Sequence, residues 1–255
     1  MGVVNITPDS FSDGGRFLER DEAIAHARRL AGEGADIIDL GGESTRPGAA
    51  PVAEAEELQR VLPVLEALAD IPVSIDTRRP GVMRAALEAG ASMINDVQAL
   101  QAPGAIEAVR DSTCAVCLMH MKGEPATMQQ EPHYDDVVAE VKGFLQQRLR
   151  ACEAGGIARE RLVVDPGFGF GKTAAHNLTL LARLAEFRHL GAPLLAGLSR
   201  KSTIGKVTGR PAAERLPGSL AMALLALQSG ATILRVHDVK ETRDVVAVWE
   251  AVRTA

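Results

Sequence analysis

The chain has 255 residues, of which 46% are apolar, 24% charged and 3% aromatic. This composition is typical of a soluble globular protein and excludes wholesale disorder. Its formal net charge is -5 and it has no long basic run to follow a phosphate backbone, so we expect no nucleic acid partner. No segment approaches the roughly 20 apolar residues of a membrane span. We therefore expect a cytoplasmic protein without membrane contact.

Short β-like runs alternate with helical stretches along the chain, which is the pattern of βα units around a parallel sheet. We expect strands at residues 1–5, 36–40, 73–76, 92–96, 115–119, 162–165, 194–198 and 233–236. The clearer helical segments are 21–33, 54–69, 80–89, 135–154, 176–186, 217–229 and 240–252. In the last of these, Trp249 repeats with valines at helical spacing, so we expect it to pack in the core.

Eight such units without a linker between halves favour one α/β domain, residues 1–255, folded as a (β/α)₈ barrel. No G-x-G-x-x-G follows the first strand, which weakens the alternative of an open dinucleotide-binding sheet. A barrel of this kind places its chemistry at the carboxyl ends of the strands.

The three cysteines are too few for a disulfide framework. Cys114 and Cys117 form a CxxC in an apolar β-like run, where positions three apart point to opposite faces. Because no second Cys or His pair accompanies them, we expect buried thiols rather than a zinc or redox site.

Polar side chains close most of the predicted strands. They are Asn5, Asp76, Asn95, Asp96, Asp165, Arg235 and His237. A helix-capping role is an equal alternative for Asp96. Asp76, Asn95 and Asp165 instead come from three strands and aim carboxylate and amide groups at one mouth, so we expect a binding site there.

Carboxylates that meet in a partly closed cavity need a cation or a ligand rich in donors. Lys201, just past the seventh strand, supplies a cation. A planar heterocycle with an amino group beside a ring N–H also suits, because one carboxylate accepts both hydrogens. Asn95 can bind a neighbouring donor and acceptor of the same ring.

Arg235 and His237 are two positions apart on a strand, so they share a face. Together with Ser199, Arg200 and Ser202 they fall in the loops after strands seven and eight, where barrels commonly bind phosphate. The sequence therefore predicts an anion site at this part of the rim.

Three loops rich in Gly have polar or aromatic residues suited to a ligand. TPDSFSDGGRF and GESTRPGAAP are predicted to close over a substrate. DPGFGFGK lacks the spacing of a phosphate loop, so its glycines are predicted to let the backbone approach a flat ligand, with Phe168 or Phe170 stacked on it. Lys172 in this loop is predicted to be solvated, and His120 to be a buried structural residue.

Eight motifs resemble those of the dihydropteroate synthase family of folate biosynthesis, in family order and across essentially the whole chain. They are NITPDSFSDGG, GGESTRPGA, SIDT, INDV, MHM with the later PATMQ, DPGFGFGK, GLSRKS and RVHDV. The resemblance implies condensation of 6-hydroxymethyl-7,8-dihydropterin pyrophosphate with p-aminobenzoate, which yields 7,8-dihydropteroate and pyrophosphate.

The resemblance also assigns residues. Asp76, Asn95, Asp165 and Lys201 are implied to hold the pterin, in a pocket lined by Met119, Phe170 and Gly197. Asn5, Arg235 and His237 are implied to hold pyrophosphate with Mg²⁺, with Asn5 as the metal ligand. Phe11, Thr45, Arg46, Pro47 and Ser202 are implied to form the p-aminobenzoate site, which sulfonamide drugs occupy in this family. Asp76, Lys201, Arg235 and His237 are the residues expected to be catalytic.

The inventory of residues suits this reaction. An arylamine is neutral near pH 7 and attacks directly, so no Ser-His-Asp or Cys-His set is needed. Two alternatives remain open: a pterin-dependent methyltransferase, which needs no pyrophosphate or aminobenzoate site, and a pterin-binding paralogue without activity.

The family resemblance further implies a homodimer, which we expect through the sixth to eighth helices. Family members usually carry a short segment before the first strand, and this sequence begins within that strand. We therefore expect that a longer amino terminus raises the melting temperature with little change in Michaelis constants.

Overall fold

The computed structural model describes residues 1–6, 16–43, 52–124 and 127–255. The strands are β1 (Gly2–Asn5), β2 (Ile38–Gly41), β3 (Val73–Asp76), β4 (Met93–Asp96), β5 (Ala115–Met119), β6 (Leu162–Asp165), β7 (Leu195–Ala196) and β8 (Ile233–Leu234). The α-helices are α1 (Arg16–Gly32), α2 (Glu54–Ala67), α3 (Pro80–Glu88), α4 (Ala105–Val109), α5 (Val137–Ala154), α6 (Ala174–Ala182), α7 (Ser202–Thr208), α8 (Leu216–Gln228) and α9 (Val239–Thr254).

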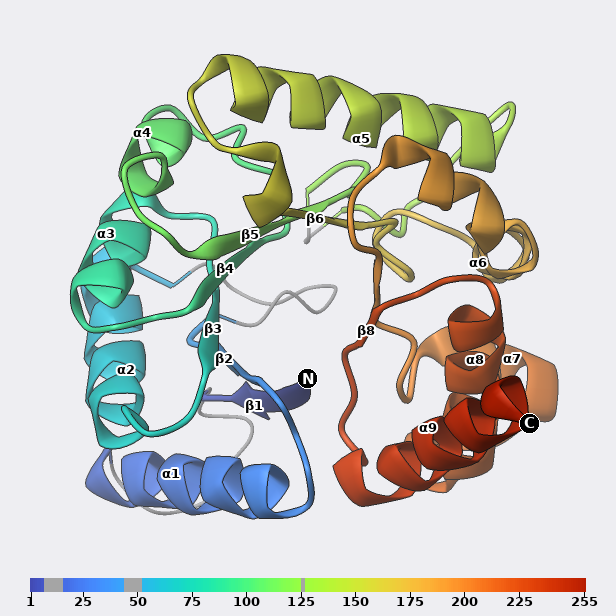
Figure 1. Ribbon diagram of the computed structural model, residues 1–255, viewed down its shortest axis with the longest axis horizontal. Coiled ribbons are helices and arrows are strands. Elements are labelled where there is room, and N and C mark those ends of the chain that lie inside the picture. Colours follow the sequence, from blue (N-terminus) through green and yellow to red (C-terminus); the bar gives the residue numbers. More distant parts are fainter. Residues whose placement is uncertain (7–15, 44–51, 125–126) are drawn as a thin grey trace.

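The strands close into a parallel barrel. β1 to β6 pair in chain order and β7 pairs with β8. Two isolated bridges join these sheets, one between Val164 and Leu194 and one between Gly2 and Val236. The second is reinforced where Val236 N donates to the Met1 carbonyl at 2.9 Å. The helices surround this ring (Figure 1), so the predicted (β/α)₈ barrel is confirmed.

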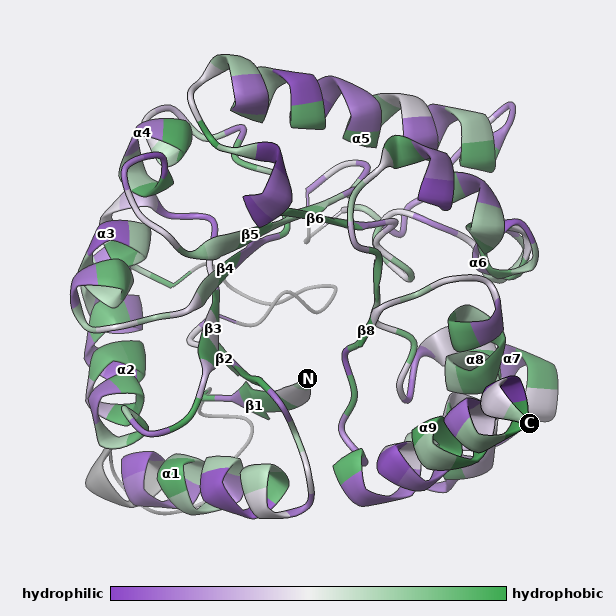
Figure 2. Cartoon of the chain, viewed as in Figure 1, coloured by the Kyte–Doolittle hydropathy of each residue, from purple (hydrophilic) through white to green (hydrophobic). Residues whose placement is uncertain are grey.

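Apolar residues fill the space between strands and helices, while a smaller cluster lies on the inner face of the strands. This inner cluster consists of Met1, Met93, Cys117, Val163 and Leu195. Cys114 belongs instead to the main core, so the two thiols are buried on opposite faces and free, as predicted. Figure 2 shows mostly green strands and helices that alternate between purple and green turns. This is the pattern of amphipathic helices around an apolar sheet.

The structure corrects several predicted boundaries. Helices α4 and α7 were not predicted, and β7 and β8 are shorter than expected. In α9, Trp249 is half-buried and packs against the core, but Val248 and Val252 are 65% and 73% exposed, so the valine spacing did not mark a core stripe. Among the described helices, none has the length and apolar composition that a membrane crossing requires.

Candidate active site

The ends of the first four strands form a continuous row of residues. Asn5 pairs in register with Gly41, Gly41 with Asp76, and Asp76 with Asn95. A β-carbon at Gly41 would lie 3.7 Å from Asn5 Oδ1 and 3.7 Å from Asp76 Cβ, so this glycine lies directly between the two polar side chains. The predicted convergence of Asn5, Asp76 and Asn95 at one rim is therefore present.

Arg235 connects this row to the far side of the barrel. It follows β8, and its Nη2 donates to Asp76 Oδ2 at 3.0 Å. Its Nε donates to Asp39 Oδ2 at 2.6 Å, and Asn95 Nδ2 donates to the same oxygen at 3.3 Å. Four elements distant in sequence thus contribute one amide, two carboxylates and one guanidinium to a single cluster.

Burial and charge act against each other in this cluster. Burial raises the pKa of Asp76 to about 7, although the neighbouring Arg235 guanidinium opposes the rise. Burial lowers the pKa of Arg235, but the carboxylates of Asp39 and Asp76 outweigh it, and the net shift is upward. Arg235 therefore remains a cation, and its charge is available to an anion at the rim.

Sequence reasoning missed Asp39. It lies inside β2, whereas the site residues predicted from the sequence lie at strand ends. It is fully buried, and Asp39 Oδ1 and Asn95 Oδ1 both lack a hydrogen-bond partner among the described residues. The sequence does contain one indication of its importance. Asp39 is the single charged residue in an otherwise apolar segment (IIDLG) that predicts a buried strand, and a buried charge needs a partner.

Lys201, Phe170 and Asp165 form the next part of the rim. Lys201 Nζ lies 4.5 Å from the centre of the Phe170 ring, within the range of a cation–π contact. Asp165 closes β6, pairs in register with the buried Met119 of β5, and accepts a hydrogen bond from Gly167 N at 2.7 Å. Burial raises the pKa of Asp165 and lowers that of Lys201 to about 8.

Residues after β7 and β8 form the predicted anion side. His237 Nδ1 lies 3.0 Å from Ser199 Oγ. Burial, together with the neighbouring Arg235 charge, lowers the pKa of His237 to about 4, so the ring is neutral near pH 7. Gly197 lies beside Arg235, since a β-carbon there would be 3.9 Å from Arg235 Cβ.

Two other residues of this region lie at or beyond its edge. Arg200 departs from the predicted anion cluster because its Nε donates to Asp238 Oδ2 at 3.0 Å. Ser202 is the first residue of α7 and directly follows Lys201, so it lies at the same rim.

Lys172 is not solvated, and that prediction is wrong. Its side chain is buried, and Nζ lies 2.9 Å from His120 Nδ1 and donates to the Gly167 and Phe170 carbonyls at 2.9 and 3.0 Å. The loop turns these carbonyls inward because Gly167, Gly169 and Gly171 all have positive φ. His120 is buried, as predicted.

The loop after β2 begins in a dense ion-pair cluster. Arg79 donates from Nη1 and Nη2 to the two Glu43 carboxylate oxygens at 2.9 and 3.0 Å, and also pairs with the buried Glu57. Val52 N donates to Glu43 Oε1 at 3.1 Å. Residues 43 and 52, on either side of an undescribed segment, are therefore tied together. The predicted aminobenzoate residues Phe11, Thr45, Arg46 and Pro47 lie outside the described residues.

The described residues contain no cluster of three or more His, Cys, Asp or Glu side chains suited to a metal ion. Mg²⁺ needs fewer protein ligands when it binds with a phosphorylated substrate, because phosphate and water oxygens complete its octahedron. The half-buried carboxamide of Asn5 offers an oxygen atom as a metal ligand at the rim, near Asp76, which fits this mode of binding.

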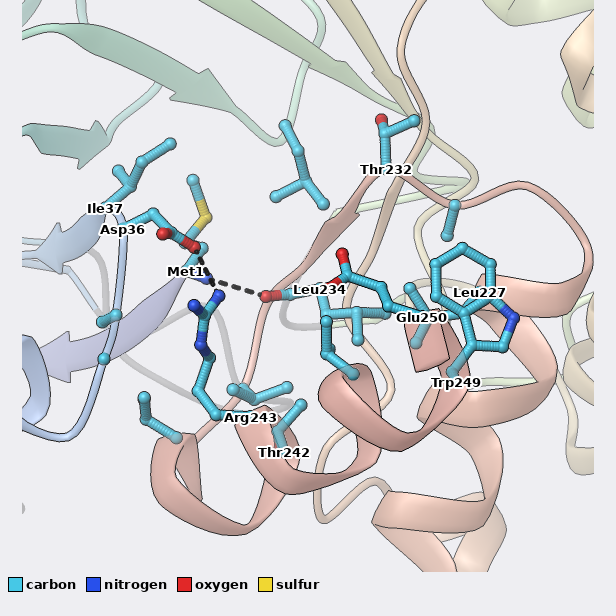
Figure 3. Close-up of a pocket in the computed structure, with 17 residues that line it drawn as sticks. Met1, Asp36, Ile37, Leu227, Thr232, Leu234, Thr242, Arg243, Trp249 and Glu250 are labelled. Atoms are coloured by element: carbon cyan, nitrogen blue, oxygen red, sulfur yellow. Dashed lines mark hydrogen bonds and ion pairs between the residues drawn. The ribbon is translucent and has the colours of Figure 1, made fainter. Parts of the chain in front are cut away.

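A separate cavity of about 450 Å³ lies at the opposite end of the barrel. It is lined by residues that precede β2 and β8 and by α9, including Asp36, Thr232 and Trp249 (Figure 3). Arg243 Nη1 lies 3.3 Å from Asp36 Oδ2 at its edge. None of the predicted site residues lines this cavity.

Comparison with known proteins agrees with the geometry of the rim. Residues 1–237 match the family of pterin binding enzymes. Dihydropteroate synthase from Escherichia coli K12 is 54% identical over 100% of this chain and 92% of its own length, and that from Haemophilus influenzae is 51% identical over 100% and 94%.

Solved structures show the same relationship. Xanthomonas albilineans dihydropteroate synthase with 4-aminobenzoic acid has a TM-score of 0.95 and 56% identity, and covers 100% of this chain and 93% of its own. The same enzyme with 7,8-dihydropteroate has a TM-score of 0.91 and 54% identity, with the same coverage. The chain therefore belongs to the pterin binding enzyme family and, within it, to the dihydropteroate synthases.

Proposed function

We propose that the protein condenses 6-hydroxymethyl-7,8-dihydropterin pyrophosphate with p-aminobenzoate to give 7,8-dihydropteroate and pyrophosphate. The observation that carries this proposal is the meeting of Arg235 with Asp76, Asp39 and Asn95 at one rim. A flat donor-rich ring and a diphosphate both find partners there. Relatives of the chain have been solved with 4-aminobenzoic acid and with 7,8-dihydropteroate, which supports the assignment.

The ring is proposed to bind between Asn95, Asp165 and Lys201. The Asp165 carboxylate has lone pairs for the ring amino group and the adjacent N–H, a bidentate geometry that discriminates strongly. Asn95 Oδ1, which has no partner in the described part of the chain, accepts a further ring N–H. Phe170, Met119 and Gly197 bound the pocket.

The diphosphate is proposed to bind Arg235 and His237. Arg235 is held as a cation by two carboxylates, and the neutral His237 donates one hydrogen bond. Asn5 is the proposed ligand of Mg²⁺, which when bound neutralises charge on the departing pyrophosphate. Stabilising the leaving group in this way lowers the barrier to breaking the C–O bond.

Bond breaking is proposed to precede bond making. The C–O bond to pyrophosphate breaks with its electron pair on oxygen and leaves an electron-deficient pterin methylene, which the Asp76 carboxylate stabilises electrostatically. The arylamine nitrogen then attacks that carbon and releases a proton. Asp76→Asn is expected to lower kcat while the pterin still binds, and unchanged turnover in that variant would contradict the role.

The second substrate is proposed to bind against Ser202 at the start of α7, together with Phe11, Thr45, Arg46 and Pro47. Because Val52 N and both Arg79 Nη atoms contact Glu43, one end of the loop that bears three of these residues is held at the rim. Sulfonamides are proposed to compete for this subsite.

The protein is also proposed to be a cytoplasmic homodimer. The three described cysteines are free and buried, which suits a reducing compartment. Exposed apolar residues occur on the neighbouring helices α7, α8 and α9, namely Val207, Leu225, Val248 and Val252. Such a group favours an interface between copies. Light scattering of the wild type and of Leu225→Glu tests this: a dimer that the substitution weakens is expected.

A pyrophosphate-release assay tests the activity. The assay contains dihydropterin pyrophosphate, with p-aminobenzoate and Mg²⁺ each omitted in turn. The expected result is release that requires Mg²⁺ and that, when p-aminobenzoate is present, forms 7,8-dihydropteroate in equal amount. A methyltransferase or an inactive paralogue would bind the pterin and release no pyrophosphate.

A further inference from the structure

Asp39 contacts both halves of the proposed substrate site without lying at the strand ends where that site is built. We propose that Asp39 is a positioning residue, which fixes the Arg235 guanidinium for the diphosphate and the Asn95 carboxamide for the pterin ring. This inference rests on the proposed function, because it concerns the same site.

A single oxygen of Asp39 makes both contacts. Asp39 Oδ2 accepts from Arg235 Nε at 2.6 Å and from Asn95 Nδ2 at 3.3 Å. Asp39 and Asn95 are 0% and 4% exposed, so water does not compete for these hydrogen bonds. The orientation of one side chain is thereby coupled to that of the other.

The contact with Asn95 decides which atom of the amide is presented to a ligand. An ionised carboxylate only accepts hydrogen bonds, so the amide must turn its nitrogen toward Asp39. Asn95 Oδ1 is then left buried and without a partner among the described residues. An oxygen in this state needs a donor, so the site selects a ring that offers N–H at that position.

The contact with Arg235 holds the guanidinium along one edge. Nε donates to Asp39 and Nη2 donates to Asp76, so carboxylates from β2 and β3 hold the planar guanidinium by two hydrogen bonds. An arginine has five N–H donors, and three remain after these two hydrogen bonds. Their direction is fixed before the diphosphate arrives, which reduces the entropy lost on binding.

A purely structural role does not account for Asp39. Burying an ion pair removes water from both charges, and this desolvation cancels much of the free energy gained from their attraction. An apolar pair in the same place is often as stable. Asp39 Oδ1 is in addition buried with no partner in the described residues, which is a further cost. The arrangement is unfavourable for stability but provides an oriented cation and an oriented acceptor.

Asp39→Asn tests the proposal, because it keeps the shape and removes the charge. The matched control is Asp36→Asn, which removes an exposed carboxylate paired with Arg243 near the start of the same strand. Calorimetry measures the affinity for inorganic pyrophosphate with Mg²⁺ and for 6-hydroxymethylpterin, and kinetics measure the KM for p-aminobenzoate. We expect affinity for both of the first two ligands to fall roughly tenfold to a hundredfold, while the KM for p-aminobenzoate changes little. The melting temperature is expected to fall as well, because Arg235 loses one of its two carboxylate partners.

A double-mutant cycle shows whether Asp39 acts through Arg235. In an Arg235→Met background, Asp39→Asn is expected to cause no further loss of pyrophosphate affinity. Additive losses, or wild-type affinity for both ligands in Asp39→Asn, would overturn the proposal. If Asp39→Asn does not fold, Asp39→Glu keeps the charge and displaces the carboxylate by one methylene, and the same losses are expected. Failure of the proposed function is distinct, because it leaves the wild type inactive whatever Asp39 does.

Discussion

Lys172 Nζ lies 2.9 Å from Nδ1 of His120 and joins the loop after β6 to the end of β5. The same ammonium donates to the carbonyls of Gly167 and Phe170 at 2.9 and 3.0 Å. The loop that follows Asp165 is thus folded around a buried lysine side chain, whose pKa burial lowers to about 7. Asp165 and Phe170, which bound the proposed ring pocket, depend on this loop for their positions.

Lys172→Met is expected to destabilise the fold by about 1–3 kcal/mol, because buried carbonyls lose their donor. The KM for the pterin substrate is expected to rise, since Phe170 loses its support. Lys122→Met is the control. Lys122 Nζ lies over the Tyr134 ring at 4.1 Å, donates to the His133 carbonyl at 2.6 Å and pairs with Glu140 at 3.3 Å. Because this side chain is exposed, its loss should cost less than about 1 kcal/mol. Urea unfolding of both variants gives the comparison, and equal losses would show that burial of Lys172 has no special importance.

His120 predicts a pH-dependent loss of stability on the acid side. Burial and, to a lesser extent, the neighbouring Lys172 charge lower its pKa to about 3. The unfolded chain takes up this proton below pH 6.5, the ordinary value, whereas the folded protein does not until about pH 3. Between these values the folded state therefore loses stability as pH falls, by up to about 1.4 kcal/mol per pH unit.

The buried carboxyls of Asp76 and Asp96 oppose this trend, since their raised pKa values favour the folded state at acid pH. Both carboxyls are present in wild type and in His120→Gln, so their contribution cancels in the difference between the two unfolding free energies. Urea unfolding from pH 7.5 to 4.5 is expected to show the wild type losing stability relative to the variant below about pH 6.5. Parallel curves would mean that His120 is protonated in the folded protein.

Asp165→Asn is expected to raise the KM for the pterin substrate by about tenfold to a hundredfold and to leave the KM for p-aminobenzoate unchanged. An amide in place of the carboxylate turns one acceptor into a donor, which faces a ring N–H. Steady-state kinetics with each substrate varied in turn measure both constants. Equal increases in the two Michaelis constants would show that Asp165 does not bind the ring.

Gly167 and Gly209 offer a matched test of loop packing. Both have positive φ, but a β-carbon at Gly167 would lie 1.9 Å from the His120 carbonyl, whereas none of the described atoms lies within 4 Å of one at Gly209. Gly209→Ala introduces backbone strain without a steric clash and is expected to lower the free energy of unfolding by about 1–2 kcal/mol. Gly167→Ala must also move the loop or β5, so its midpoint in urea should fall well below that of Gly209→Ala.

Much of the site could be predicted because parallel strands bring their ends together. Asn5, Asp76 and Asp165 close their strands and Asn95 is the penultimate residue of β4. The register places Asn5, Asp76 and Asn95 in one row. Asp39 was missed because nothing in a local pattern says that one charge inside a strand pairs with a guanidinium 196 residues away.

The errors have similar physical causes. The burial of Lys172 depends on three glycines with positive φ, which turn carbonyls toward one point. The periodicity of the sequence does not indicate where backbone carbonyls meet, so a lysine in a polar loop was predicted to be solvated. Helices α4 and α7 have five and seven residues, too short to show a helical repeat. Val248 and Val252 have core-like spacing, yet no described element covers them.

The most direct test of the account is a crystal structure with 6-hydroxymethyl-7,8-dihydropterin pyrophosphate bound. We predict the ring between Asn95, Asp165 and Lys201, with its diphosphate against Arg235 and His237. The molecule bound instead in the cavity beside Trp249, at the other end of the barrel, would contradict it.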